Sequence, residues 1–163
     1  MTLGAGSRHN DRPRKPAMTS TSGATMTPYQ CKADQLLQHF GQTLGTPLRL
    51  KDGVCALFDA QGTELAVVEV PVHSDSVILH CNLLPLGHDL PSQALRQLLR
   101  LNFEIGAMQG SWLAIDEQDA LCLCYVLSLE RTDERHFSDT LNAFISQAKD
   151  VRTFSADLLR QAA

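Results

Sequence analysis

The chain has 163 residues, of which 44% are hydrophobic and 20% charged, a composition that suits one domain with a sizeable core. Four of its 14 basic residues and one of its 18 acidic residues lie in residues 1–25, so residues 26–163 carry a net charge of −7 and would repel a nucleic-acid backbone. No apolar run has the length of a secretory signal or a membrane span, so we expect a cytosolic protein without membrane insertion.

Residues 1–25 differ in composition from the rest of the chain. They are rich in Gly, Ser, Thr and Pro and contain a basic cluster, Arg8, Arg12, Arg14 and Lys15. Such a segment cannot bury enough apolar area to offset its ordering entropy. An Arg-rich start is also typical of transit peptides, but Pro13 and Pro16 would break the required helix. We therefore predict a disordered leader, or a misassigned start codon, over 1–25 and one folded domain over 26–163.

The first predicted elements are a helix and three strands. Pro28 suits a first helical turn, an apolar stripe runs from Ala33 to Leu44, and Gly45 and Pro47 end the pattern, which predicts a helix over 28–44. Strands are predicted over 54–58 and 64–70, joined by a hairpin turn. A third follows over 76–84, where alternation places four residues on one buried face: Val77, Leu79, Cys81 and Leu83.

The second predicted helix begins near Pro91 and carries an unusually wide apolar surface. Its polar residues span only about 100° of arc, whereas the apolar residues from Ala94 to Ile105 span about 200°. A surface helix needs an apolar stripe of roughly 100° to cover one core. We therefore expect this helix to contact a second subunit as well as the sheet. Asn102 falls inside the apolar arc, either as a locally satisfied side chain or as a polar group that fixes the register between subunits.

Two more strands, over 112–115 and 121–127, precede a last helix that begins near Asp133. Its apolar pattern weakens after Lys149 and returns at Val151, which indicates a bend or a restart. The order α-β-β-β-α-β-β-α predicts an α+β fold in which helices pack against one twisted antiparallel sheet.

Residues for catalysis are sparse. The five cysteines are odd in number and lack a C-x-x-C pair, so we interpret them as reduced, apolar core residues rather than metal ligands. The six histidines are scattered, and no nucleophile elbow, phosphate loop or metal motif is present. We expect no cofactor and no enzymatic activity. A ligand-binding or accessory subunit remains an alternative, although only Asn102 and His80 offer inward polar groups for it.

Besides the leading amphipathic helix, three strings stand out: Leu48–Gly53, Leu98–Phe103 and Gly110–Asp116, the last close to a G-x-x-L-x-x-D pattern. Together with the element order, they resemble class I type III secretion chaperones of the Tir-chaperone (CesT-like) family. The resemblance covers Tyr29 to Leu159. It implies a cytosolic homodimer that binds the N-terminal region of an effector in an extended state, keeps it soluble and presents it to the secretion apparatus and its ATPase.

The resemblance also suggests where each partner binds. Sheet edges and apolar grooves suit an extended chain, so we predict effector contacts on the first helix and first strands: Leu36, Leu37, Phe40, Val54, Ala56, Phe58, Ala66 and Val68. At least half of these could equally form the subunit's own core. For the homodimer we predict an interface around the second helix: Leu95, Leu98, Leu99, Leu101, Asn102 and Trp112.

Overall fold

The computed structural model of the chain describes residues 25–87 and 90–162. They form an α+β domain in the order α1 (Pro28–Leu44), β1 (Val54–Phe58), β2 (Glu64–Glu69), β3 (Ser76–Pro85), α2 (Ser92–Leu101), α3 (Ile105–Met108), β4 (Trp112–Ile115), β5 (Ala120–Ser128) and α4 (Glu134–Ala162). The predicted fold class is confirmed. The predicted leader falls almost entirely outside the described residues.

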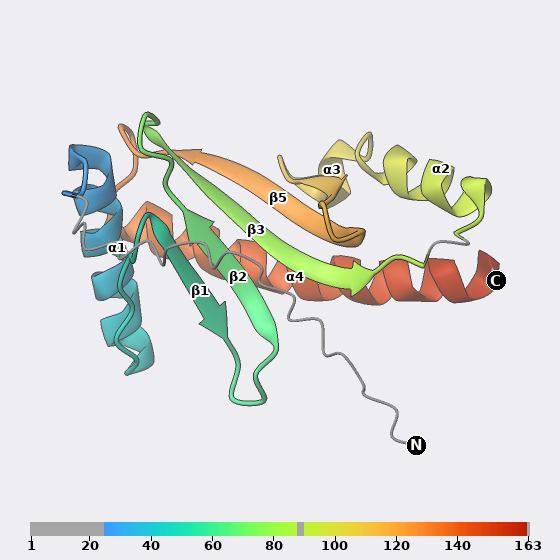
Figure 1. The fold of residues 1–163 in the computed structure, drawn as a ribbon, viewed down its shortest axis with the longest axis horizontal. Helices are drawn as coiled ribbons and strands as arrows, with labels where there is room; N and C mark the ends of the chain where they lie inside the picture. Colours follow the sequence, from blue (N-terminus) through green and yellow to red (C-terminus); the bar gives the residue numbers. More distant parts are fainter. Residues whose placement is uncertain (1–24, 88–89, 163) are drawn as a thin grey trace, which may run out of the picture.

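The strands form one antiparallel sheet in the order β1-β2-β3-β5-β4. Its edges are therefore β1 and β4, which come from opposite halves of the chain. Figure 1 shows α4 running along the sheet, with α1 and the β1–β2 hairpin at one end and α2 and α3 at the other.

Helix α1 begins and ends with the expected signals. Thr27 caps its N-terminus in a capping box with Gln30, Pro28 occupies the first turn, and Gly45 ends the helix in the left-handed region at φ 67°. Ala33, Leu36, Leu37 and Phe40 of its apolar stripe are buried in the subunit, whereas Leu44 at its end is exposed.

One face of the sheet, the inner face, forms the core. Val77, Leu79, Cys81 and Leu83 of β3 are buried, as the alternation predicts, and they pack with β2, β5, α1 and α4. Phe137, Leu141, Phe144 and Ala148 supply the apolar stripe of α4. The helix continues through Lys149 without a restart, because Val151 keeps the same stripe buried before Phe154 turns to solvent.

Helix α2 is shorter than predicted. It ends at Leu101, and Asn102 caps it with helical φ and ψ of −60° and −20°. The chain then makes a tight turn into the four-residue α3, so Phe103 and Ile105 do not belong to the helix that the sequence indicated. The predicted apolar arc thus divides into a helix face and a separate exposed turn.

Candidate functional site

Strand β1 exposes a row of side chains on the side of the sheet opposite the core. Its residues alternate strictly, so Cys55 and Leu57 are buried while Val54, Ala56 and Phe58 are exposed. The exposed fractions are 40% for Val54 and 57% for Phe58, which are large for apolar residues of a sheet strand. Because side chains alternate along the strand, β1 has one face in the core and one face exposed to solvent.

Among the described residues, the backbone of β1 is also open on its outer edge. Lys51 and Val54 exchange two backbone hydrogen bonds, at 2.9 and 3.0 Å, across a turn in which Gly53 has φ 82°. These bonds occupy the edge at Val54. Alternation in an antiparallel ladder then directs the N–H and C=O groups of Ala56 and Phe58 away from β2, toward the same edge. Two consecutive positions for strand pairing thus lie beside an exposed aromatic ring.

A buried carboxylate holds the start of this edge in place. Asp34 of α1 is 6% exposed, and its Oδ1 accepts a hydrogen bond from the backbone N–H of Leu50 at 2.8 Å. The Arg49 guanidinium lies 3.0 Å from Oδ2 of the same carboxylate. Nearby, Gln30 Nε2 donates to the carbonyl of Val70 at 3.0 Å, where only a glycine at position 53 leaves room. Helix α1 therefore fixes the segment that leads into β1.

The exposed row of β1 continues across the sheet as a surface that we call the outer face. It carries the Glu69–His80 ion pair, whose nearest atoms are 3.6 Å apart. Strand register places on it Val54, Ala56, Phe58, Val67, Glu69, Ile78, His80, Trp112, Ala114, Cys122, Cys124 and Val126. The helices that contact the strands pack against the inner face. On the outer face Val54, Phe58, Trp112 and Val126 are exposed, whereas Val67 and Cys122 are buried.

The predicted effector-binding residues divide between these two faces. Five of them are less than 6% exposed and belong to the subunit's own core: Leu36, Leu37, Phe40, Ala66 and Val68. The other three, on β1, lie on the outer face. This division arises because α1 closes the inner face beside α4, and periodicity alone does not identify which surface a stripe will cover.

The predicted dimer residues also differ in position. Leu98 is buried in the core, Leu95 and Leu101 are half-buried, and Leu99 and Trp112 are exposed by 65% and 38%. Two neighbours left out of the predicted interface are more exposed still, Phe103 at 88% and Ile105 at 81%. Both were part of the wide apolar arc in the sequence, which was the signal that could have included them.

Asn102 is satisfied inside the subunit. Its Oδ1 accepts from the backbone N–H of Leu113 at 2.7 Å, and its Nδ2 donates to the backbone C=O of Leu113 at 3.3 Å. The side-chain amide thus pairs with β4 as a strand residue would. This is the locally satisfied arrangement of the two that the sequence left open.

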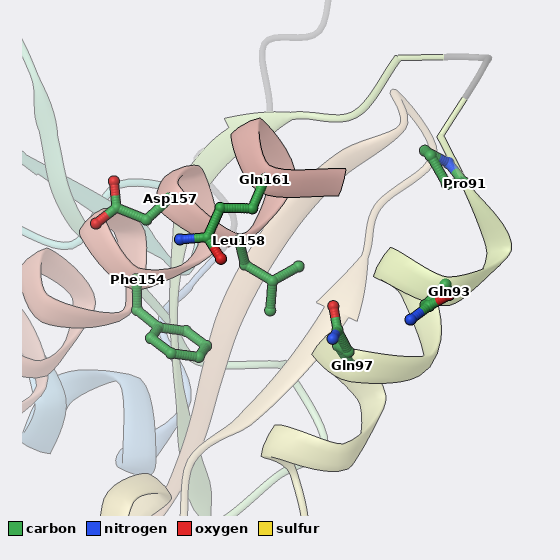
Figure 2. Close-up of a pocket in the computed structure, with 7 residues that line it drawn as sticks. All are labelled: Pro91, Gln93, Gln97, Phe154, Asp157, Leu158 and Gln161. Carbon is green, nitrogen blue, oxygen red and sulfur yellow. The ribbon is translucent and has the colours of Figure 1, made fainter. Parts of the chain in front are cut away.

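A groove between α2 and the end of α4 has a volume of about 720 Å³. Figure 2 shows Phe154, Asp157, Leu158 and Gln161 of α4 lying opposite Pro91, Gln93 and Gln97. Its polar groups are mainly glutamine amides at the surface. A small-molecule site usually has buried polar groups that converge on the ligand, and this groove does not supply them.

The Cys122 thiol does not favour metal or redox chemistry either. Burial, with a further contribution from the Asp116 charge, raises the pKa of Cys122 to about 12, so its thiol stays protonated at neutral pH. Cys122 Sγ lies 2.9 Å from Oδ1 of Asn82. No group of three or more metal-ligating side chains gathers within the described part of the chain. Likewise, no helix in the described ranges has the length and apolarity to cross a bilayer.

An α+β domain with an open strand edge and an exposed apolar row beside it has a surface suited to pairing with another polypeptide. The sequence model of the Tir chaperone protein (CesT) family matches residues 35–152, from the middle of α1 to the middle of α4. The chain therefore belongs to the Tir chaperone family. No curated protein sequence matches it.

Solved structures of chaperone complexes share this fold. The chain matches the HopA1–SchA chaperone–effector complex with a TM-score of 0.61 at 17% identity, covering 79% of this chain and 99% of that one. It matches the ExsC–ExsE complex with a TM-score of 0.62 at 17% identity, covering 80% and 95%. For the ExoU–SpcU complex of the Pseudomonas aeruginosa type III secretion system, the TM-score is 0.57 at 24% identity, covering 77% and 96%. At these identities the likeness establishes the fold.

Proposed function

We propose that this protein is a non-catalytic type III secretion chaperone of the bacterial cytoplasm. It binds the N-terminal region of an effector in an extended state, keeps that region soluble, and delivers it to the secretion apparatus and its ATPase. Membership of the Tir chaperone family and the fold shared with a chaperone–effector complex support this function. The observation that carries it is the β1 edge, where free backbone groups and an exposed apolar row lie together.

Binding at this edge follows from the needs of an unfolded partner. An extended segment offers unpaired backbone N–H and C=O groups and apolar side chains on alternate positions. The edge-facing groups of Ala56 and Phe58 pair with the backbone groups of that segment. The outer face beside Phe58 accepts its apolar side chains. The free energy comes from strand pairing and apolar burial, and no reactive side chain is required. We therefore restrict the predicted effector contacts to Val54, Ala56 and Phe58.

Co-purification with an effector fragment tests this function. The chain should be co-expressed with roughly the first hundred residues of the effector encoded beside its gene, a length sufficient to wrap a small domain. We expect a stable complex with the wild type and loss of the complex with Ala56→Pro, because the edge-facing N–H disappears while the bonds to β2 remain. Phe58→Asp should have the same effect by placing a charge on the apolar row.

A matched control lies on the opposite edge of the sheet. Ile115→Pro removes an N–H that faces away from β5, so it perturbs an edge strand to the same extent without touching β1. It should leave the complex intact. If Ile115→Pro and Ala56→Pro weaken the complex equally while circular dichroism is unchanged, the effector does not pair with β1.

The second part of the proposal is a homodimer formed around α2 and the turn that follows it. The exposed side chains of Leu99, Phe103, Ile105 and Trp112 support it, since burying each contributes roughly 1.5–3 kcal/mol. Light scattering should give twice the chain mass for the wild type and a lower mass for Phe103→Asp. A monomeric wild-type protein would contradict the dimer without affecting the proposed effector edge.

A further inference from the structure

The second edge strand of the sheet, β4, also directs backbone groups to its free side. A hairpin bond from the N–H of Asp116 to the C=O of Ala120, at 3.0 Å, sets the alternation of the β4–β5 ladder. Trp112 and Ala114 therefore pair with β5, whereas Leu113 and Ile115 present their N–H and C=O groups outward. An edge of this kind is a template for any extended chain, including a second copy of the same protein.

Asn102 occupies this template at Leu113. Its amide satisfies both backbone groups of Leu113, with the acceptor at 2.7 Å and the donor at 3.3 Å, as the next strand of a sheet would. The end of α2 places the side chain there, because Asn102 is the residue that caps the helix. Asparagine suits the position since its side chain carries the same donor and acceptor as a peptide group.

We propose that Asn102 is an edge-blocking residue that closes β4 to strand addition and so confines it to β1. With Leu113 occupied, β4 offers a single open position at Ile115, whereas β1 offers two consecutive positions at Ala56 and Phe58. One added strand per subunit follows from this difference. The inference goes beyond the proposed function, because it concerns the pairing of the sheet with any extended chain and can be tested without an effector.

The competing explanation is that Asn102 only fastens α2 to β4. Both roles use the same two hydrogen bonds, so a loss of stability on mutation does not separate them. They differ in what the freed edge does. If Asn102 only fastens α2, its mutation gives a less stable subunit with an unchanged association state. If Asn102 blocks the edge, its mutation gives an edge that pairs with other copies of the chain.

Sedimentation velocity of the full chain over a range of concentrations separates the two roles. We expect Asn102→Ala to form species larger than the wild-type protein at about a tenfold lower concentration, because two more groups of β4 become available for pairing. The double variant Asn102→Ala/Ile115→Pro should return to wild-type behaviour, since proline blocks the same edge without removing a bond to β5. Ile115→Pro alone provides the matched control.

The outcomes that overturn the proposal are distinct. A folded Asn102→Ala protein that keeps the wild-type size at every concentration shows that the edge does not pair. Larger species that Ile115→Pro fails to reverse arise elsewhere and overturn it equally. If circular dichroism shows that Asn102→Ala is unfolded, Asn102→Asp is assayed in the same way, because a carboxylate still accepts from Leu113 N–H but cannot donate to its C=O. Unfolding of both variants assigns Asn102 to fastening α2 and overturns the blocking role.

Discussion

The two faces of the sheet carry similar residues but have different cover. On the inner face, Val68, Leu79 and Leu123 are fully buried beneath α1 and α4. On the outer face, Val54, Phe58 and Val126 are 40 to 57% exposed. A sheet with apolar residues on both faces needs cover on both. The chain itself covers the inner face, and we propose that a binding partner covers the outer one.

Truncating one apolar residue on each face gives the largest expected contrast. Leu79→Ala on the inner face should lower the free energy of unfolding by about 2–5 kcal/mol, because it leaves a cavity in a closed core. Phe58→Ala on the outer face should lower it by less than about 1 kcal/mol, since most of that ring already contacts solvent. Urea denaturation of the two variants measures the difference. Equal losses would mean that Phe58 is a core residue and would remove the distinction between the faces.

A single arginine joins the two strands at the middle of the sheet, where their pairing is short. Strands β2 and β3 pair only from Val67 to Glu69, which leaves Glu64 of β2 and Asn82 and Leu83 of β3 outside the ladder between them. Arg152 of α4 extends into the gap, donating to the C=O groups of Leu83 at 3.0 Å, Asn82 at 2.9 Å and Glu64 at 3.2 Å. Helix α4 therefore covers the inner face with polar as well as apolar contacts.

We expect Arg152→Met to lower the free energy of unfolding by about 1–3 kcal/mol, because the apolar stem is kept while several carbonyls lose a charged donor. The matched control is Arg160→Met on the same helix, where the guanidinium makes an exposed contact with Asp157 and the expected change is below about 0.5 kcal/mol. Denaturation curves of both variants check this. A change no larger than that of the control would show that β2 and β3 hold together without the arginine.

Much of this arrangement could be predicted from local sequence signals. The capping residues of α1, the hairpin turns and the alternation of β3 determine which elements form and which β3 residues face the core. Local signals did not predict the long-range contacts. Leu36 and Phe40 form an ordinary apolar stripe, and nothing local identifies whether a sheet of the same chain or a foreign peptide will cover it. The β1 residues Val54 and Phe58 became assignable only once the register with β2 was known.

The end of α2 is the clearest example of this limit. Helical spacing continues through Ile105, so periodicity predicts a longer helix with Asn102 inside its apolar arc. The helix instead ends at Leu101, and the Asn102 amide pairs with Leu113, eleven residues away and on another element. A tertiary contact that replaces a helical turn leaves no periodic signal. It places Phe103 in an exposed turn and Ile105 at the start of the separate helix α3.

A thiol on the outer face gives a stability effect with a defined pH dependence. Burial and the neighbouring Asp116 charge raise the pKa of Cys122 to about 12, whereas a cysteine in an unfolded chain has a pKa of about 8.5. The folded state therefore holds this proton more tightly than the unfolded state. The resulting stabilisation is complete below about pH 8.5 and is lost progressively as the pH rises toward 12.

Comparison of the wild type with Cys122→Ala isolates this dependence, because every other titrating group is common to both proteins. The difference between their free energies of unfolding should stay constant between about pH 6 and pH 8 and change by about pH 10.5, with the wild type losing more stability. Urea denaturation at these pH values measures it. A constant difference at all three would show that the thiol ionises alike in both states.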